Sequence, residues 1–297
     1  MWNSLDATRN SLSTFLGNAF SFQTVKRTPR VVLYFVLFAA AVITSRKVIL
    51  MKNKRKQLDY SKKRKDVVIL HHFSRSVGIP SLSPFVLKLE TYLRMAKIPY
   101  ENDFSGSSTG PKGKVPYITL NGMEMGDSQL IIEFLNEKYN INLSSNLSNE
   151  QKAIARALRI MAEDHFFWCL ILYRWFFDDD CNVIKATTWS FPLRLLLVPI
   201  IRRILKRQSW NQGIGRHTDT EVMDMARNDI LALSVYLGNK KFFMGNEPSE
   251  VDCALFGFLA QLVYTPMPEF EKLINEDMKN IKEYCKRMKE RFWSDWN

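Results

Sequence analysis

Cysteine is scarce in this chain of 297 residues, and its four cysteines lie far apart. They are Cys169, Cys181, Cys253 and Cys285, and no two of them form a Cys-x-x-Cys pair. This spacing excludes the disulfide framework that is typical of small secreted domains. We therefore expect buried or free thiols in a reducing compartment.

Clusters of metal ligands are lacking as well. The one run of three acidic residues is Asp178–Asp180, and no second group of ligands accompanies it in the sequence. A solvated helix end explains this run better than a divalent-cation site does. We expect no metal site.

Acidic residues are nearly absent from the first 65 residues. This segment holds 14 of the 42 Lys and Arg residues but only two of the 30 Asp and Glu residues. The net charge of +12 therefore belongs to this segment, because residues 66–297 carry equal numbers of both signs. The folded part has no basic excess for phosphate recognition, so nucleic acid is not expected as a partner.

One long apolar run is present, and it lies in the same N-terminal segment. Val31–Ser45 is uncharged, and after Arg46 and Lys47 the apolar sequence resumes as far as Met51. A spanning helix can accommodate two cations that snorkel, so the sequence favours a membrane anchor over residues 31–51. The alternative is a buried or interfacial helix.

The flanks of this run predict its orientation. Residues 1–30 are polar and are expected to be disordered, and residues 52–65 form a basic linker. Ten Lys and Arg residues lie in residues 46–65, against four before the run. The positive-inside rule then predicts a single-pass N-terminal anchor with the folded domain facing the cytosol. Sugar on either of the sequons at Asn142 and Asn146 would reverse this orientation.

The stretch from Lys114 to Ser128 predicts a strand, a tight turn, a second strand and a helix start. Asn121-Gly122 is a strong hairpin signal, because both turn residues must adopt a positive φ angle. Pro116 stands where the first strand begins, and a missing N–H is tolerated there. The acidic residue before Ser128 precedes an amphipathic run and suits the N-cap of a helix.

Val-Pro entering a β-hairpin that is closed by Asp-Ser at a helix N-terminus resembles the glutathione-binding half of the glutathione transferases. The resemblance implies a cis peptide bond at Pro116 and a site in which the backbone of Val115 pairs with the peptide of glutathione. It also implies that Asp127 and Ser128 bind the γ-glutamyl end. Glutathione is thus the expected cofactor.

Residues 66–143 have the order β-α-β-β-β-α, which the resemblance identifies as a thioredoxin-like α/β domain. Ser83 and Pro84 open its first helix with a favoured N-cap arrangement, and the helical spacing allows Lys88 and Arg94 to face water. Ser83 is the candidate catalytic residue, because a hydroxyl at a helix N-terminus can donate a hydrogen bond to a glutathione thiolate. The alternative is that Ser83 only caps its helix.

A helix that family members usually place between the second strand and the Val-Pro strand is lacking. The interval Ser105–Lys114 is rich in Gly and Ser and is too short for a regular helix. In the family this helix often helps to hold the glycine end of glutathione. Lys112 and Lys114 are either substitute partners for that carboxylate or solvated loop charges.

Residues 148–297 predict an all-α C-terminal domain. A capping box at Ser148 and Gln151 starts a helical run that reaches Trp175 or beyond, and a last amphipathic helix is expected over residues 269–292. The fold class is therefore glutathione transferase-like. It combines a thioredoxin-like α/β N-terminal domain with an all-α C-terminal domain, preceded by an N-terminal membrane helix.

Two further stretches of this domain are informative. Residues 181–218 contain seven Lys and Arg residues and no acid, and Pro192 and Pro199 are expected to break this apolar segment. It is either an ordinary helix with one buried face or a basic helix that lies on an anionic membrane. The capping box at Ser249 and Asp252 resembles the C-terminal signature of the transferases and supports the fold rather than catalysis.

Three segments identify a branch of the family: residues 83–95, the short interval before Gly113-Lys-Val-Pro, and Gly213-x-Gly-Arg-His217. They most resemble the failed axon connections group, which includes cadmium-responsive members and is related to the metaxins. The resemblance covers about residues 66–292. It implies a membrane-anchored protein linked to neuronal development or metal stress.

Three interpretations of function follow from this resemblance. The favoured one is an adaptor that is non-catalytic or weakly active. The alternatives are a glutathione-dependent transferase in which Ser83 activates the thiol, and a metaxin-like component of protein import. Metaxins typically carry a C-terminal anchor that the last residues here do not resemble, which weakens the third. Expected partners are the membrane through the N-terminal helix, a second copy of the chain in a homodimer, and unidentified proteins.

Overall fold

The computed structural model describes residues 65–104, 110–180, 182–185, 187 and 191–296. The predicted membrane anchor and its flanks lie in residues 1–64, outside the described residues. Among the residues that are described, no helix is long and apolar enough to cross a membrane. All of them belong to one compact unit, Tyr60–Asn297.

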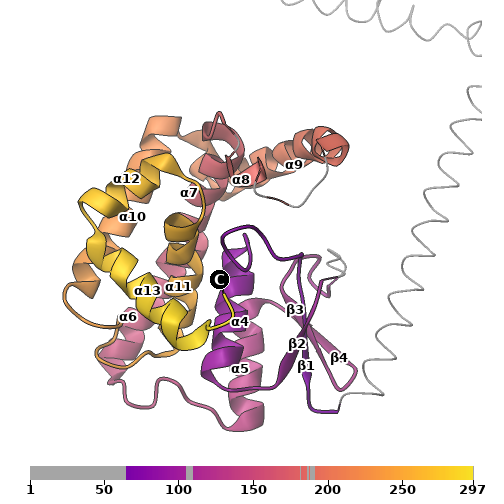
Figure 1. The fold of residues 1–297 in the computed structure, drawn as a ribbon, viewed down its shortest axis with the longest axis vertical. Helices are drawn as coiled ribbons and strands as arrows, with labels where there is room; N and C mark the ends of the chain where they lie inside the picture. Colours follow the sequence, from indigo (N-terminus) through magenta and orange to yellow (C-terminus); the bar gives the residue numbers. More distant parts are fainter. Residues whose placement is uncertain (1–64, 105–109, 181, 186, 188–190, 297) are drawn as a thin grey trace, which may run out of the picture. The chain divides into compact units, whose positions relative to one another are not determined.

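The first half of this unit is a four-stranded sheet with two helices on the face that meets the helical domain (Figure 1). The strand order is β2-β1-β3-β4, in which β1 and β2 are parallel and the other neighbours are antiparallel. Its elements are β1 (Val68–His71), α4 (Pro84–Met95), β2 (Tyr100–Asp103), β3 (Tyr117–Leu120), β4 (Met123–Gly126) and α5 (Ser128–Tyr139). The predicted order β-α-β-β-β-α is confirmed.

The predicted turn between β3 and β4 is also confirmed. Asn121 and Gly122 have φ angles of 50° and 85°, as the two central residues of a type I′ turn require. In the interval before β3, residues 110–116 form turns and contain no helix, whereas 105–109 lie outside the described part. The described half of this interval thus agrees with the predicted loss of a helix.

The second half of the unit is helical. The run that begins at the capping box of Ser148 continues to Phe177, but two of its segments are π-helical. Segments of this kind are rare and occur frequently at functional sites. The helical elements are α6 (Asn149–Ile160), η1 (Met161–Phe166), α7 (Phe167–Leu172), η2 (Tyr173–Phe177), α8 (Asn182–Lys185), α9 (Phe191–Gln212), η3 (Ile214–Arg216), α10 (Asp219–Leu237), α11 (Glu250–Tyr264), α12 (Pro268–Glu276) and α13 (Lys279–Phe292).

Two helix boundaries differ from the predictions. Helix α9 runs through Pro199, which was expected to break it. Pro199 is exposed, so water can satisfy the carbonyl group that loses its partner. The single helix predicted over 269–292 is divided at Asp277 and Met278, where the buried side chain of Met278 lies between two helices that each face the core.

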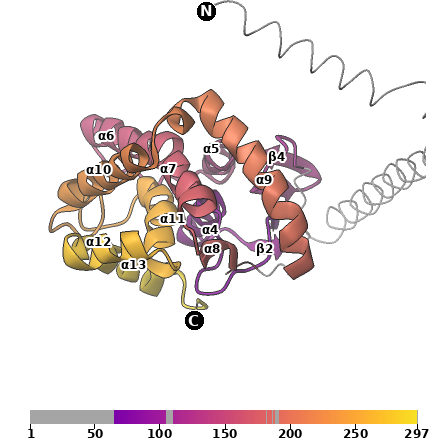
Figure 2. The ribbon, with the colours of Figure 1, turned by 90° about the horizontal axis from the view of Figure 1, so that it is seen from above.

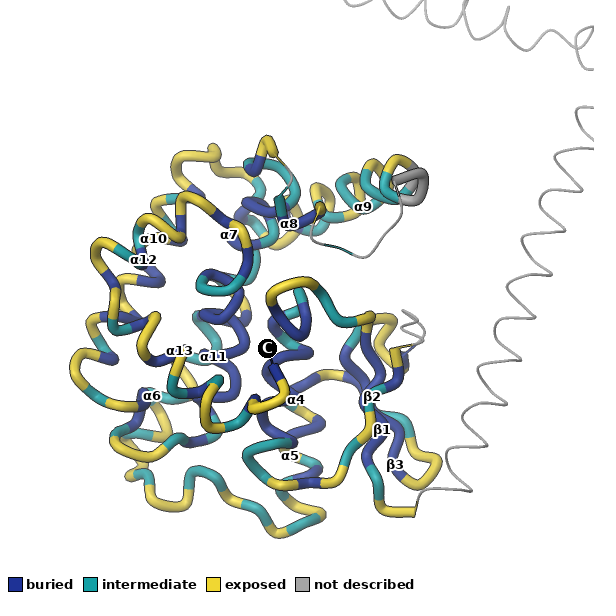
Figure 3. The backbone as a smooth tube through the Cα atoms, viewed as in Figure 1, coloured by how far each residue is buried: buried dark blue, intermediate teal, exposed yellow. Residues whose placement is uncertain are grey.

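Helices α4 and α11 join the two halves, and both consist largely of buried residues, which are dark blue in Figure 3. Leu87 of α4 belongs to the core of the helical domain, and Cys253 of α11 belongs to the core of the sheet. At Gly257 the helices approach so closely that a Cβ atom would lie 2.6 Å from the carbonyl oxygen of Pro84. Glycine at this position is what permits the contact.

The prediction that Lys88 faces water is wrong. Its side chain is 1% exposed, because the helical domain covers the face of α4 that the helical spacing assigned to solvent. The ammonium group donates to Glu163 of η1 and, over 2.8 Å, to Gln129 of α5. Arg94 remains partly exposed and binds Asp295 near the C-terminus.

Candidate functional site

Ser83 lies at the N-terminus of α4, as predicted. Its hydroxyl oxygen accepts a hydrogen bond from the backbone N–H of Val86 at 3.4 Å, and Pro84 follows at the first helical position. Ser83 therefore caps the helix. A hydroxyl that accepts in this way can still donate its proton, so the cap is compatible with a hydrogen bond to a thiolate.

The loop before Ser83 is held by two buried side chains of the helical domain. Arg174 of η2 donates to the carbonyl oxygen of Leu82 at 2.9 Å and to Gln261 at 2.8 Å, and Gln261 donates to the carbonyl oxygen of Ser81 at 3.1 Å. Burial lowers the pKa of Arg174 to about 9, so the guanidinium stays charged at neutral pH. The helical domain thereby fixes the backbone on which Ser83 stands.

The hairpin residues gather at one end of the sheet. The peptide bond between Val115 and Pro116 is cis, as the resemblance implied. Tyr117 pairs with both Gly126 and His71, so Pro116 and Asp127 lie beside each other where β1 ends. Because the crossover from β1 to the parallel β2 makes α4 run antiparallel to them, the N-terminus of α4 lies at the same end.

Asp127 caps α5 in an unusual backbone conformation. One carboxylate oxygen accepts from the backbone N–H groups of Gln129 at 3.0 Å and Leu130 at 3.2 Å. The φ angle of 85° and ψ of 115° are rare for a residue other than glycine. Such strain costs about 1–3 kcal/mol and is concentrated at functional sites. The side chain is 44% exposed and thus accessible to a ligand.

The neighbours of Asp127 complete this end of the site. Ser128 is buried at the first position of α5. Lys112 packs against Gly126, and its ammonium group lies 3.8 Å from the second carboxylate oxygen of Asp127. Lys112 is therefore placed at the γ-glutamyl end of the expected site rather than at the glycine end, and Lys114 is exposed.

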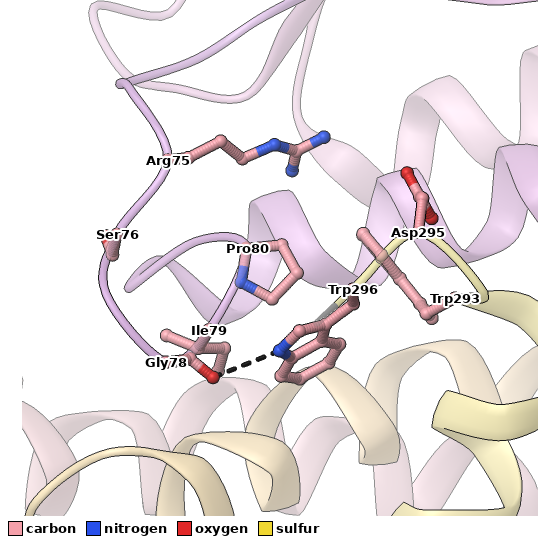
Figure 4. A pocket seen from close by; sticks show the side chains of 8 residues that line it. All are labelled: Arg75, Ser76, Gly78, Ile79, Pro80, Trp293, Asp295 and Trp296. Atoms are coloured by element: carbon pink, nitrogen blue, oxygen red, sulfur yellow. Dashed lines mark hydrogen bonds between the residues drawn. The ribbon is translucent and has the colours of Figure 1, made fainter.

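A cavity of about 190 Å³ lies beside this region but does not contain Ser83 or Asp127 (Figure 4). The chain before α4 and the C-terminal residues line it: Arg75, Ser76, Gly78, Ile79, Pro80, Trp293, Asp295 and Trp296. The indole N–H of Trp296 donates to the carbonyl oxygen of Gly78 at 3.1 Å. Arg75 is occupied by a bidentate ion pair with the buried Glu90, at 2.6 and 2.7 Å. The positive charge of Arg75 is therefore already neutralised by Glu90.

Sequence reasoning missed the ionic contacts behind the site. Lys88 connects the first turn of α5, through Gln129, with Glu163, whose other oxygen accepts from Arg159 at 2.7 Å. Burial lowers the pKa of Lys88, and Glu163 opposes that change. No spacing in the sequence links Lys88 to Glu163, which lies 75 residues away in the other domain.

Two family descriptions match this fold. The one called "Glutathione S-transferase N-terminal domain" matches residues 84–181, and the one called "Glutathione S-transferase, C-terminal domain" matches residues 226–288. Together they cover more than half of the chain.

Curated relatives agree with these matches. The chain is 34% identical over 254 residues to Failed axon connections of Drosophila melanogaster, which covers 78% of this chain and 60% of that protein. It is 29% identical to an isoprene-epoxide–glutathione S-transferase of Rhodococcus, over 76% of this chain and 99% of the relative. Metaxin-2 of Mus musculus is 25% identical over 71% of this chain and 82% of its own length.

Solved structures support the fold. A beta-etherase from Sphingobium superposes with a TM-score of 0.55 at 18% identity, over 75% of this chain and 94% of the other. A glutathione S-transferase from Methylobacterium radiotolerans in complex with glutathione sulfonate gives 0.51 at 15% identity, over 76% and 91%. The chain belongs to the glutathione transferase-like proteins, in the group of failed axon connections, which is related to the metaxins.

Proposed function

We propose that this chain is a membrane-anchored protein that binds glutathione through its γ-glutamyl end and acts as an adaptor with little or no transferase activity. The observation that carries the proposal is the geometry at Asp127. A carboxylate is held at a helix start, in a strained backbone conformation, with one oxygen used for capping and the other 3.8 Å from the ammonium group of Lys112. Strain of this kind is retained where a ligand contact needs it.

The proposed ligand contacts follow from charge. The second carboxylate oxygen of Asp127, which faces Lys112, would accept from the α-ammonium group of the γ-glutamyl end. Lys112 and the N-terminus of α5, with the hydroxyl of Ser128, would face its α-carboxylate. The backbone of Val115 would pair with the peptide of glutathione.

We propose weak catalysis because two features that would act on glutathione are missing: a cysteine for its thiol and, among the described residues, a helix for its glycine end. No cysteine stands at Ser83 or next to it, so thiol-disulfide exchange is not expected. In the described half of the interval before β3 no helix holds the glycine end. A glutathione transferase in which Ser83 activates the thiol is the second candidate. The isoprene-epoxide relative, matched over 99% of its length, favours it.

Calorimetric titration of the full-length chain with glutathione tests the binding site. Asp127→Asn should weaken binding about tenfold or more, because a hydrogen bond to a charged group contributes about 1.5–3 kcal/mol. Asparagine caps a helix well and tolerates a positive φ angle, so the fold should be kept. Glu137→Ala, an exposed acid on the same helix, is the matched control.

Two outcomes would contradict these assignments. No binding heat at millimolar glutathione would exclude the site altogether. A Ser83→Ala variant that binds normally yet loses glutathione conjugation of an epoxide would make Ser83 catalytic and replace the adaptor with the transferase.

Membrane attachment is proposed from the apolar run at residues 31–51 and from the surface of α9. Helix α9 stands out from the body of the helical domain in Figures 1 and 2 and is largely exposed in Figure 3. Its exposed face combines apolar and basic side chains without an acid: Leu195, Ile200, Ile204 and Trp210 with Arg203, Lys206 and Arg207. Such a face suits anionic lipid headgroups.

The two glycosylation sequons of the chain itself can test the cytosolic orientation. Asn142 and Asn146 are both exposed and would be accessible to glycosylation in a luminal domain. We expect that endoglycosidase treatment of the chain expressed in animal cells leaves its gel mobility unchanged. A version directed to the lumen by an added signal peptide should change its gel mobility on the same treatment. This control shows that the two sequons can be glycosylated. A shift in the unmodified chain would place the domain in the lumen.

A further inference from the structure

Three side chains of metal-ligand type meet in the helical domain, away from the glutathione site. His165 comes from η1, Cys169 from α7 and Asp229 from α10, and their ligand atoms all lie within 4.8 Å of one another. The imidazole Nδ1 of His165 lies 2.6 Å from a carboxylate oxygen of Asp229. Cys169 is 1% exposed, whereas the side chain of His165 is 44% exposed.

The local helix geometry explains this meeting. His165 and Cys169 are four residues apart, so they point to the same side of the helical run. The junction between π-helical η1 and α7 falls between them, and α10 packs along this side. The hydrogen bond with Asp229 fixes the imidazole before any ligand arrives. The two polar ligands are thus positioned by the fold itself.

We propose that His165, Cys169 and Asp229 form a binding site for one thiophilic divalent cation of the zinc class. Sulfur, imidazole nitrogen and carboxylate oxygen are the three ligand types that zinc takes, whereas calcium and magnesium require oxygen ligands. Three protein ligands leave the fourth tetrahedral position open. The exposed side of His165 gives water and the entering ion a path to it.

Charge balance supports a cation at this place. A thiolate and a carboxylate together neutralise a divalent ion, and the imidazole is neutral. A cysteine thiol holds its proton at neutral pH until a metal ion binds. On binding, the S–H bond breaks, the sulfur lone pair is donated to the metal, and the proton passes to solvent. No oxidation or reduction takes place.

The ligand atoms need only a small rearrangement. Zinc–nitrogen and zinc–oxygen bonds of about 2.0–2.2 Å and a zinc–sulfur bond of about 2.3 Å place tetrahedral ligands roughly 3.3–3.7 Å apart. His165 and Asp229 would therefore separate by about 1 Å from their present contact, and the thiol of Cys169 would move inwards.

Cobalt(II) is the probe for this site, because a thiolate ligand gives it a charge-transfer band in the near ultraviolet. The full-length chain is titrated in a Cys181→Ser background, since Cys181 lies outside the described residues. We expect one equivalent of cobalt with tetrahedral visible bands, release of about one proton, and loss of the bands when zinc is added. Asp229→Asn keeps an acceptor for His165 and should weaken binding at least tenfold.

Matched cysteine variants decide the assignment. Cys169→Ala and Cys169→Ser should abolish the charge-transfer band, whereas Cys285→Ala should keep it, because Cys285 is equally buried on α13 but lies outside the cluster. Circular dichroism identifies any variant that has lost its fold. A band that persists in a folded Cys169 variant, or a folded chain that binds no cobalt at micromolar concentration, would overturn the proposal.

Discussion

Asp252→Ala is expected to lower the free energy of unfolding by about 3–5 kcal/mol. Asp252 is fully buried at the start of α11, and its carboxylate accepts from the backbone N–H of Phe243 at 3.1 Å and of Ser249 at 2.8 Å. The hydroxyl of Ser249 donates to it as well, at 3.1 Å. Alanine would leave these donors buried without partners, and each such donor costs about 1–3 kcal/mol.

Urea unfolding followed by circular dichroism measures this effect. Asp252→Asn should also destabilise the chain, since its NH₂ group would face one of the donors that the carboxylate now accepts from. Asp224→Ala is the control, because Asp224 is 58% exposed and pairs only with a neighbouring arginine on the surface. If Asp252→Ala loses less than about 1 kcal/mol, the capping box does not hold the helical domain together.

Glu163→Gln is expected to destabilise the chain by about 3–5 kcal/mol at neutral pH, because it leaves the ammonium group of Lys88 buried without a counter-charge. Lys88 is 1% exposed and Glu163 9% exposed. Lys88→Met keeps the volume and removes the cation. The double variant should therefore be more stable than the sum of the single losses predicts, and unfolding of all four proteins measures the coupling.

The effect of Glu163→Gln should depend on pH. The pKa of Lys88 in the folded chain is already below its ordinary value because of burial, and loss of Glu163 lowers it further. Between the folded and the unfolded pKa values the unfolded chain binds more protons, so stability rises as the pH is raised. The variant should regain part of its loss at alkaline pH. A loss that does not change with pH would show that Lys88 is not the cause.

Local patterns in the sequence predicted most elements of the fold. The turn at Asn121-Gly122, the cap at Ser83 and the capping boxes at Ser148 and Ser249 each depend on residues within a few positions, and all four are confirmed. The Asp127 N-cap is confirmed in the same way. These devices need no knowledge of the tertiary structure, because their partners are neighbours in sequence.

Contacts between distant segments could not be predicted in this way. Helical spacing shows only which side of its own helix a residue lies on, and it placed Lys88 on the side that was expected to face water. In the structure η1, from the other domain, covers that side. The cluster of His165, Cys169 and Asp229 was missed for the same reason: the four-residue spacing of the first two was visible, but the third lies 64 residues from His165. The roles of Ser83, Val115, Pro116, Asp127 and Ser128 in binding or activating glutathione stay predictions.

The close approach at Gly257 has a consequence for how the molecule comes apart. Since α4 and α11 meet backbone to backbone and each contributes to the core of the other half, neither half can open without exposing apolar surface of its neighbour. The sheet and the helices should therefore form a single cooperative folding unit. A chain divided between α5 and α6 would give two fragments that are unstable alone and regain structure only on mixing.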